Sequence, residues 1–322
     1  MDNKGKRSLP LDLKRSEARE ALLRVIDRAD IFITNLLPAR RKKYGLDHES
    51  LLERHPSLLV GAVSGYGNGG GGADWPAFDY SAYWARTGMM DIMHDEGVAP
   101  SMQRPAVGDH AAAVNLVCGL MAAMRMRDAT GEGRYVDVSL LQTGLHILGT
   151  DIANALVTRE PPRRHDRRAA PNALWNSYPV AEGRWLLLVM IEADRYWPSF
   201  CEAIDRPDLF EDPRFENAWQ RSHNCRELIA ELESTFRERT LDAWKAPVNQ
   251  VEEAIDDPQA RAMGYFQEVD HPEAGRFETV GPPFRIDGCE LGARTGAAPL
   301  GSDARDVLRE AGLTSEELEK LV

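Results

Sequence analysis

The spacing of apolar residues along the first half of the chain alternates between helical and strand periods. Residues 16–29 and 112–124 repeat apolar side chains every three or four positions, which predicts helices. Apolar or alternating runs at 31–35, 58–64 and 135–140 have the length of strands. Strands and helices in this order form a parallel sheet with helical crossovers. We therefore expect an α/β fold in this half.

Finer signals predict the ends of several elements. Ser16, followed by an acidic first turn, is expected to cap the first helix. A basic turn at 39–43 should lead into a short helix at 50–54. Two more helices are expected at 78–90 and 142–157, the second as one long element.

The pattern changes after a charged, proline-containing segment at 159–171, which is typical of a linker. Runs at 176–178 and 185–191 on either side of Glu182 and Gly183 predict an antiparallel hairpin. The remaining expected elements are helices at 194–203, 221–237, 241–245, 251–254 and 304–311, a strand pair at 266–269 and 277–280, and a helix with a capping box formed by Thr314 and Glu317. This half predicts a smaller α+β lobe.

Composition excludes several classes of protein. The 322 residues carry a net charge of −12, which argues against a nucleic-acid partner, because such binding needs clustered basic surface. Cys118, Cys201, Cys225 and Cys289 form no CxxC pair, so no metal site or disulfide framework is expected. The N-terminus lacks a signal-peptide core, and no membrane span is expected. We expect a soluble cytoplasmic protein.

The glycine-rich stretch at 64–72 contains GxGxxG at Gly65, Gly67 and Gly70. A dinucleotide site requires a helix directly after these glycines to receive the pyrophosphate. Ala73-Asp-Trp-Pro76 follows instead, which favours a mobile loop at a strand end over a nicotinamide or flavin site.

Asp109 is the only residue that we nominate as a nucleophile. It follows the turn-prone Gly108 and falls in or just before the first turn of the helix predicted from residue 112 onward. An aspartate there can simply cap free backbone N–H groups. The same placement would present an ionised carboxylate to an activated carbonyl. From the residues alone both interpretations stay open.

Short motifs in a fixed order run through nearly the whole chain. They are residues 3–13 (NKGKRSLPLDL), 29–35 (ADIFITN), 64–67 (SGYG), 108–109 (GD), 130–139 (TGEGRYVDVS), 246–249 (APVN) and 257–259 (DPQ). As a set they resemble the class III CoA-transferase family, which includes formyl-CoA and carnitine CoA-transferases and α-methylacyl-CoA racemases. From this resemblance we expect a CoA-transferase that has no permanently bound cofactor and no metal.

The resemblance implies a Rossmann-like large domain, a small domain and an interlocked homodimer. We place the large CoA-binding domain at 1–158 and 288–322, the linker at 159–171 and the small α+β domain at 172–287. The family's catalytic aspartate matches Asp109. Its carboxylate would attack an acyl-CoA thioester to give an anhydride and CoA thiolate, then an aspartyl-CoA thioester, from which a carboxylic acid takes the CoA. Asp109 must be ionised for this, and a helix N-terminus favours that form.

By the same resemblance, several residues match positions that line the nucleotide and pantetheine of coenzyme A. They are Leu11, Lys14, Asn35, Leu36, Lys43, Phe78 and Leu140. Lys14 and the run 40–43 would meet phosphates. Asn172 and Asn176 begin the small lobe, where the family has a loop over the active site. His110 points away from its neighbour on a helix and is interpreted as structural, as are Trp185 and Trp197.

Two departures from the family pattern bear on function. The family usually has a strand and helix before the position of Asn3, and the passage 241–247 is shorter than usual. A missing strand would leave a sheet edge unpaired. Trp75, Tyr80 and Trp84 near Phe78 suggest room for a bulky acyl group.

Three hypotheses follow. The first is CoA transfer through Asp109. The second is racemisation of a 2-methylacyl-CoA, which needs a histidine before Asp79 as a second base. Phe78 stands at that position instead. Glu192 matches an acidic residue of the racemases, but without the histidine it has little to orient. The third is a CoA-binding homologue without activity.

Overall fold

The computed structural model describes residues 2–95, 97–244 and 248–321. Lys245, Ala246 and Pro247 lie outside the described residues. The end of the helix expected at 241–245 and the start of the motif at 246–249 therefore cannot be compared with the structure.

The chain divides into two compact units. Unit 1 comprises Met1–His94, Val98–Pro162 and Tyr265–Val322, and unit 2 comprises Asp95–Gly97 and Arg163–Gly264. The chain returns to unit 1 at Tyr265, earlier than residue 288, where the sequence pattern placed the start of the returning segment.

The main sheet of unit 1 is parallel, as its sequence pattern predicts. Its strands β1 (Ile31–Thr34), β2 (Leu59–Ser64) and β3 (Arg134–Ser139) lie side by side in this order. β2 is the most deeply buried of them, with five of its six residues buried. Such burial explains why β2 reads as an apolar run rather than an alternating one.

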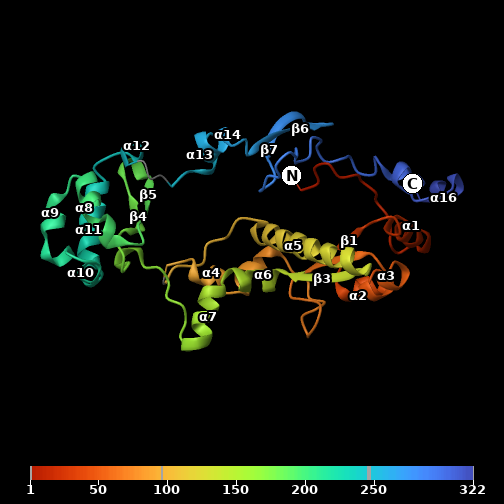
Figure 1. The fold of residues 1–322 in the computed structure, drawn as a ribbon, viewed down its shortest axis with the longest axis horizontal. Helices are drawn as coiled ribbons and strands as arrows, with labels where there is room; N and C mark the ends of the chain where they lie inside the picture. The colour runs from red at the N-terminus through yellow and green to blue at the C-terminus, as the bar shows by residue number, and fades with distance from the viewer. Residues whose placement is uncertain (1, 96, 245–247, 322) are drawn as a thin grey trace. The chain divides into compact units, whose positions relative to one another are not determined.

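The long helix α5 (Val107–Thr130) packs against β2 and β3 (Figure 1). Leu116 and Leu120 sit so close to Gly61 of β2 that a Cβ there would lie 3.2 and 3.3 Å from their methyl groups. Glycine in the middle of the strand thus allows the helix to approach. The same helix buries Ala112 and Ala123 in the core.

Among the described residues, α5 alone is long and apolar enough to cross a bilayer by length and composition, which was not expected from the sequence. This is weak evidence for a membrane span, because the central helix of a soluble protein meets the same criteria. α5 also carries Asp109, Arg125, Arg127 and Asp128.

The helices around β1 differ in detail from their predictions. α1 (Ser16–Ile26) starts at Ser16 itself, so Arg15 occupies the capping position and the hydroxyl of Ser16 contacts Glu17. The basic segment expected as a turn is α2 (Pro38–Tyr44), started by a proline and ended by the left-handed Gly45. α3 (His48–Arg54) is capped by Asp47, whose side chain accepts from the Ser50 N–H.

The helix expected at 78–90 is instead a π-helix, η1 (Tyr80–Ala85), followed by a short helix α4 (Met89–Ile92). Gly88, with φ of 88°, separates the two. The helix expected at 142–157 is also divided, into α6 (Leu140–Ile147) and α7 (Gly149–Thr158), at Leu148. Periodicity alone misses both breaks, because the apolar spacing continues across them.

The C-terminal segment returns to α1. β6 (Phe266–His271) and β7 (Gly275–Val280) form the predicted antiparallel pair. α15 (Ala304–Glu310) and α16 (Ser315–Glu319) follow, and the capping box of Thr314 and Glu317 is confirmed. Leu308 packs with Ala21 of α1, and Arg24 lies 3.0 Å from Glu317.

Unit 2 is the predicted α+β arrangement. β4 (Trp175–Pro179) and β5 (Trp185–Val189) form an antiparallel hairpin. The helix expected at 221–237 is divided at Asn224. The helices are α8 (Ala193–Ala203), α9 (Pro207–Glu211), α10 (Ala218–His223), α11 (Cys225–Phe236), α12 (Leu241–Trp244), α13 (Val251–Ile255) and α14 (Pro258–Ala262), with single 3₁₀ turns at Arg167–Ala169, Ala181–Gly183 and Pro213–Phe215.

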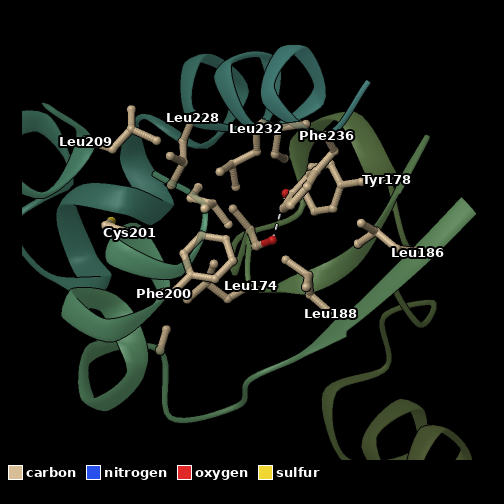
Figure 2. Packing of buried hydrophobic residues seen from close by; sticks show 14 of the residues in the cluster. Leu174, Tyr178, Leu186, Leu188, Phe200, Cys201, Leu209, Leu228, Leu232 and Phe236 are labelled. Atoms are coloured by element: carbon tan, nitrogen blue, oxygen red, sulfur yellow. Dashed lines mark hydrogen bonds between the residues drawn. The ribbon is translucent and has the colours of Figure 1, made fainter. Parts of the chain in front are cut away.

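One face of this hairpin packs against α8 and α11 to form the core of unit 2 (Figure 2). The hydroxyl of the buried Tyr178 donates to the Ala173 carbonyl at 2.7 Å, so its polar end is satisfied inside the core. Trp197 is buried here as expected. Trp185 is not: it is exposed, with the Arg167 guanidinium over its ring.

Candidate active site

The carboxyl edge of the parallel sheet collects the loops that follow its strands. After β2, the glycine-rich stretch runs through bends and turns with no helix directly after its glycines, which removes the dinucleotide interpretation. The Ser64 hydroxyl accepts from the Gly67 N–H, and the Leu141 N–H donates to the Gly65 carbonyl. The ends of β2 and β3 are thereby tied together where ligands of α/β proteins bind.

α5 brings Asp109 to this edge. The helix ends at Thr130, just before the start of β3, so it runs opposite to the strands and begins at their carboxyl side. Its 24 residues span roughly 36 Å, whereas a six-residue strand spans roughly 20 Å. The first turn, which contains Asp109, therefore extends beyond the strand ends.

Asp109 is exposed and is not the helix cap. Ala106 precedes the helix, in a left-handed conformation and without a side-chain bond to it. The Gly108 N–H donates instead to Oδ1 of Asp79 at 3.1 Å, across 29 residues of sequence. No described residue donates a hydrogen bond to Asp109. Its carboxylate is thus available for chemistry.

Asp79, which was not nominated from the sequence, contacts the first turn of α5. It is only 4 % exposed, and its Oδ2 has no hydrogen-bond partner among the described residues. A Cβ on Gly108 would lie 2.4 Å from Oδ1 of Asp79 and 2.3 Å from Cγ of Tyr83. The Gly-Asp pair at 108–109 therefore reflects a close approach that only glycine permits. Nothing local in the sequence signals this contact.

The surroundings of Asp109 oppose its charge. Partial burial raises the pKa of its carboxyl above 3.8, the Asp79 carboxylate raises this pKa further, and His110 lowers it. This direction is opposite to the one we expected from the helix N-terminus. His110 itself is exposed and lies 3.4 Å from Asp2. The structural role expected for His110 stays a prediction.

Two of the residues matched to coenzyme A contacts line one cavity. Asn35 and Leu36 follow β1 and border a pocket of about 320 Å³, with Leu13, Leu46 and Val63 among its other walls. This pocket opens at the carboxyl end of β1. A mostly apolar wall with a few polar groups suits a pantetheine chain or an adenine ring.

The other matched positions are more dispersed. Leu11 is partly buried and Lys14 exposed, both in the segment before α1. Lys43 is exposed in the last turn of α2, within 5.8 Å of the Tyr44 ring. Phe78 is 77 % exposed directly before Asp79, whereas Leu140 is only 5 % exposed and packs into the core of unit 1. The side chain of Leu140 therefore supports the fold, and its contact with coenzyme A stays a prediction.

The aromatic residues after the glycine-rich loop do not form the acyl pocket we expected. Trp84 is buried in the core of unit 1. Trp75 is exposed, and the Arg86 guanidinium lies 5.2 Å from the centre of its ring and 5.2 Å from that of Tyr66. Arg86 was not among the residues nominated from the sequence.

In unit 2, Asn172 and Asn176 are used by the fold. Asn172 bonds the Met190 carbonyl and the Leu174 N–H, and buried Asn176 contacts His165 and the Arg167 carbonyl. Glu192 borders a pocket of about 480 Å³ and lies 3.4 Å from Arg195. The described residues contain no group of three or more potential metal ligands.

An exposed carboxylate on a helix at the carboxyl edge of a parallel sheet, with a cavity at the same edge, stands where α/β proteins bind their ligands. The chain belongs to CoA-transferase family III, whose family profile matches residues 1–304. The resemblance found from the sequence is confirmed.

The curated relatives are similar over nearly the whole chain. The (R)-2-hydroxy-4-methylpentanoate CoA-transferase of Clostridioides difficile is 29% identical over 99% of this chain and 82% of its own length. The succinyl-CoA:mesaconate CoA-transferase of Haloarcula hispanica is 31% identical over 97% of this chain and 81% of its own. The crystal structure of a CAIB/BAIF family protein from Brucella suis matches with a TM-score of 0.83, at 26% identity, over 96% of this chain and 82% of that one.

Proposed function

We propose that this enzyme transfers coenzyme A from an acyl-CoA to a carboxylic acid, with Asp109 as the covalent nucleophile. The observation that carries the assignment is the state of that side chain: it is exposed in the first turn of α5, while Asp79 takes the capping role. A side chain needed only as a cap would be bonded to the helix N-terminus.

The proposed reaction balances without ATP or an added proton. A carboxylate oxygen of Asp109 attacks the thioester carbonyl, the C–S bond breaks, and CoA leaves as a thiolate. The thiolate attacks the aspartyl carbonyl of the anhydride, which releases the donor acid and leaves an aspartyl-CoA thioester. The acceptor carboxylate then repeats the first step, and the returning thiolate takes the acceptor acyl group. Each intermediate stays activated.

The activities for which the relatives are named support this substrate class. They pair acyl-CoA compounds with acids such as phenyllactate and mesaconate. We propose that coenzyme A lies along the carboxyl end of β1, where Asn35 and Leu36 border a cavity and the exposed Lys14 and Lys43 can meet its phosphates. A screen of acyl-CoA donors against carboxylic acids would identify the pair.

The test is covalent labelling of the nucleophile. The enzyme is incubated with an acyl-CoA and quenched with hydroxylamine or borohydride, and the peptides are analysed by mass spectrometry. We expect modification of the peptide that contains Asp109, and none in Asp109→Asn. Asp128→Asn, a change to another exposed aspartate on the same helix, should label like the wild type. An unmodified wild-type peptide during measurable CoA transfer would refute the role of Asp109.

We infer that the working enzyme is a homodimer. α5 leaves Val114, Val117 and Met121, which share one face of the helix, about half exposed, although they are large and apolar. Contiguous apolar surface of this kind marks an interaction site. A second copy of the chain is the occupant that the family resemblance implies.

The four cysteines are free thiols, which supports the proposal of a cytoplasmic location.

A further inference from the structure

The start of α5 has two carboxylates with different tasks. The side chain of Asp79 is buried, reaches α5 from the residue before η1, and accepts the Gly108 N–H with one oxygen. Asp109 is exposed and accepts nothing from a described residue. A helix begins with backbone N–H groups that lack a partner within the helix. Because Asp79 accepts a hydrogen bond from one of them, Asp109 is not needed as a cap.

We propose that Asp79 is a positioning residue for the nucleophile, which caps α5 in place of Asp109 and opposes the charge of Asp109 with its own. This proposal rests on the proposed function of Asp109. Asp79 touches no reacting atom, so it acts through the helix terminus and through electrostatics.

The electrostatic part follows from the burial of Asp79. Its second oxygen is buried without a partner, so little solvent screens this charge from the neighbouring first turn of α5. Acylation of Asp109 removes one of two adjacent negative charges. The repulsion therefore exists in the resting enzyme and is relieved in the anhydride, which favours its formation.

The groups that face Asp109 and Asp79 are few. On α5, His110 lies beside the nucleophile and lowers its pKa, while its ring also faces Asp2. On η1, Tyr83 lies beside Gly108, and burial and Asp79 raise its pKa. The pKa of Asp109 is raised first by burial and then by Asp79. A carboxylate of higher pKa is the more basic nucleophile.

Two variants separate the two tasks. Asp79→Asn keeps an oxygen that can accept the Gly108 N–H but removes the charge, whereas Asp79→Ala removes both. The rate of acyl-enzyme formation is followed by quench and mass spectrometry between pH 4 and 8. Asp47→Asn, which alters the cap of α3 in the same way, is the matched control.

We expect Asp79→Asn to move the acid limb of the rate profile to lower pH, because the neighbouring charge that raises the pKa of Asp109 is gone. The less basic carboxylate should also reduce the plateau rate by about threefold to tenfold. Asp79→Ala should lose more rate, and Asp47→Asn none. An unchanged pH profile in Asp79→Asn would overturn the electrostatic role, and an unchanged rate in Asp79→Ala would overturn the positioning role. If the wild type forms no acyl-enzyme, the proposed function fails instead.

A separate observation concerns Arg86, which follows η1. Its guanidinium lies over the rings of Tyr66 and Trp75, each at 5.2 Å, at the loop that leaves the carboxyl end of β2. No described residue is its hydrogen-bond or ion-pair partner. Asp74, the acid on this loop, accepts the Ala39 N–H instead. The two rings thus hold the planar guanidinium of Arg86 in place, while its N–H donors have no partner among the described residues.

We infer that Arg86 binds an oxyanion, either the carboxylate of the acceptor acid or a phosphate of coenzyme A. Both are substrates of the proposed reaction, and an arginine fork matches both. An enzyme with a net charge of −12 needs such a local cation to attract them.

The test compares Arg86→Met and Arg86→Lys with Arg237→Met, a change to an exposed arginine of unit 2. The KM for the acceptor is measured at saturating donor, and binding of coenzyme A and of pantetheine is measured by calorimetry. Because a hydrogen bond to a charged group is lost, Arg86→Met should either raise the acceptor KM or weaken coenzyme A binding by about tenfold or more. A higher acceptor KM indicates the carboxylate. Weaker binding of coenzyme A but not of pantetheine indicates a phosphate. Lysine should restore part of either effect, and no change in both arms for Arg86→Met overturns the inference.

Discussion

Gly108→Ala tests the contact on which the active-site geometry depends. Its added Cβ would lie 2.3 Å from Cγ of Tyr83 and 2.4 Å from Oδ1 of Asp79, whereas ordinary contacts begin at 3.4 Å. The start of α5 must therefore move by roughly 1 Å. A displacement of this size at a reacting group can cost about 100-fold in rate.

The cost in stability can be assembled from the same contacts. Overpacking costs about 1–3 kcal/mol, and weakening the hydrogen bond from Gly108 to the Asp79 carboxylate costs about 1.5–3 kcal/mol. Alanine returns about 1 kcal/mol because it favours a helix more than glycine does. A net loss of about 1.5–5 kcal/mol follows, which lowers the melting temperature by roughly 3–20 °C.

The assay is thermal unfolding together with the acyl-enzyme rate. Gly149→Ala is the matched control, because nothing lies within 4 Å of the position that its new methyl group would occupy, and it also stands at a helix start. We expect that variant to be as stable as the wild type or slightly more so. If Gly108→Ala keeps both wild-type stability and wild-type rate, the close approach of Asp79 and Tyr83 to α5 is not what positions Asp109.

Three further outcomes are expected. Asp109→Asn should stabilise the protein at pH 7, because the raised pKa of Asp109 means that folding disfavours its charged form. Urea unfolding from pH 3 to 8 should show this gain in stability above pH 3.8 and its loss below that pH. A loss of stability at pH 7 would contradict the prediction. Val117→Asp with Met121→Asp should shift the sedimentation coefficient from dimer to monomer; an unchanged dimer would place the interface elsewhere. Tyr178→Phe should cost about 1–2 kcal/mol in denaturant unfolding, since it leaves the Ala173 carbonyl unpaired; a neutral change would mean that this bond adds nothing.

Sequence patterns predicted what local chemistry determines. The parallel strands, the α5 helix and the Thr314 capping box follow from apolar spacing and from residues three or four apart. The division at Leu148 and the π-helix at Tyr80–Ala85 were not predicted, because the apolar period continues through both. These breaks depend on tertiary packing, which a periodic pattern does not encode.

The candidate site was predictable only in part. Asp109 could be nominated from the Gly-Asp pair and the start of a helix, but the sequence left both capping and catalysis open as its role. The distinction depends on Asp79, which is 29 residues away from Gly108 in the chain. Leu140 is matched to a ligand-lining position only by the family resemblance, and its side chain is buried in the core of unit 1, which the sequence does not indicate.

The racemase alternative can be argued from the same neighbours. Removal and return of an α-proton from opposite faces needs two titratable groups across the substrate. Phe78 stands where that histidine would be, and His110 faces Asp2 beside the nucleophile. Covalent transfer needs only the single exposed carboxylate that the site provides. Exchange of solvent deuterium into the α-carbon of a 2-methylacyl-CoA, with no label on Asp109, would reverse this conclusion.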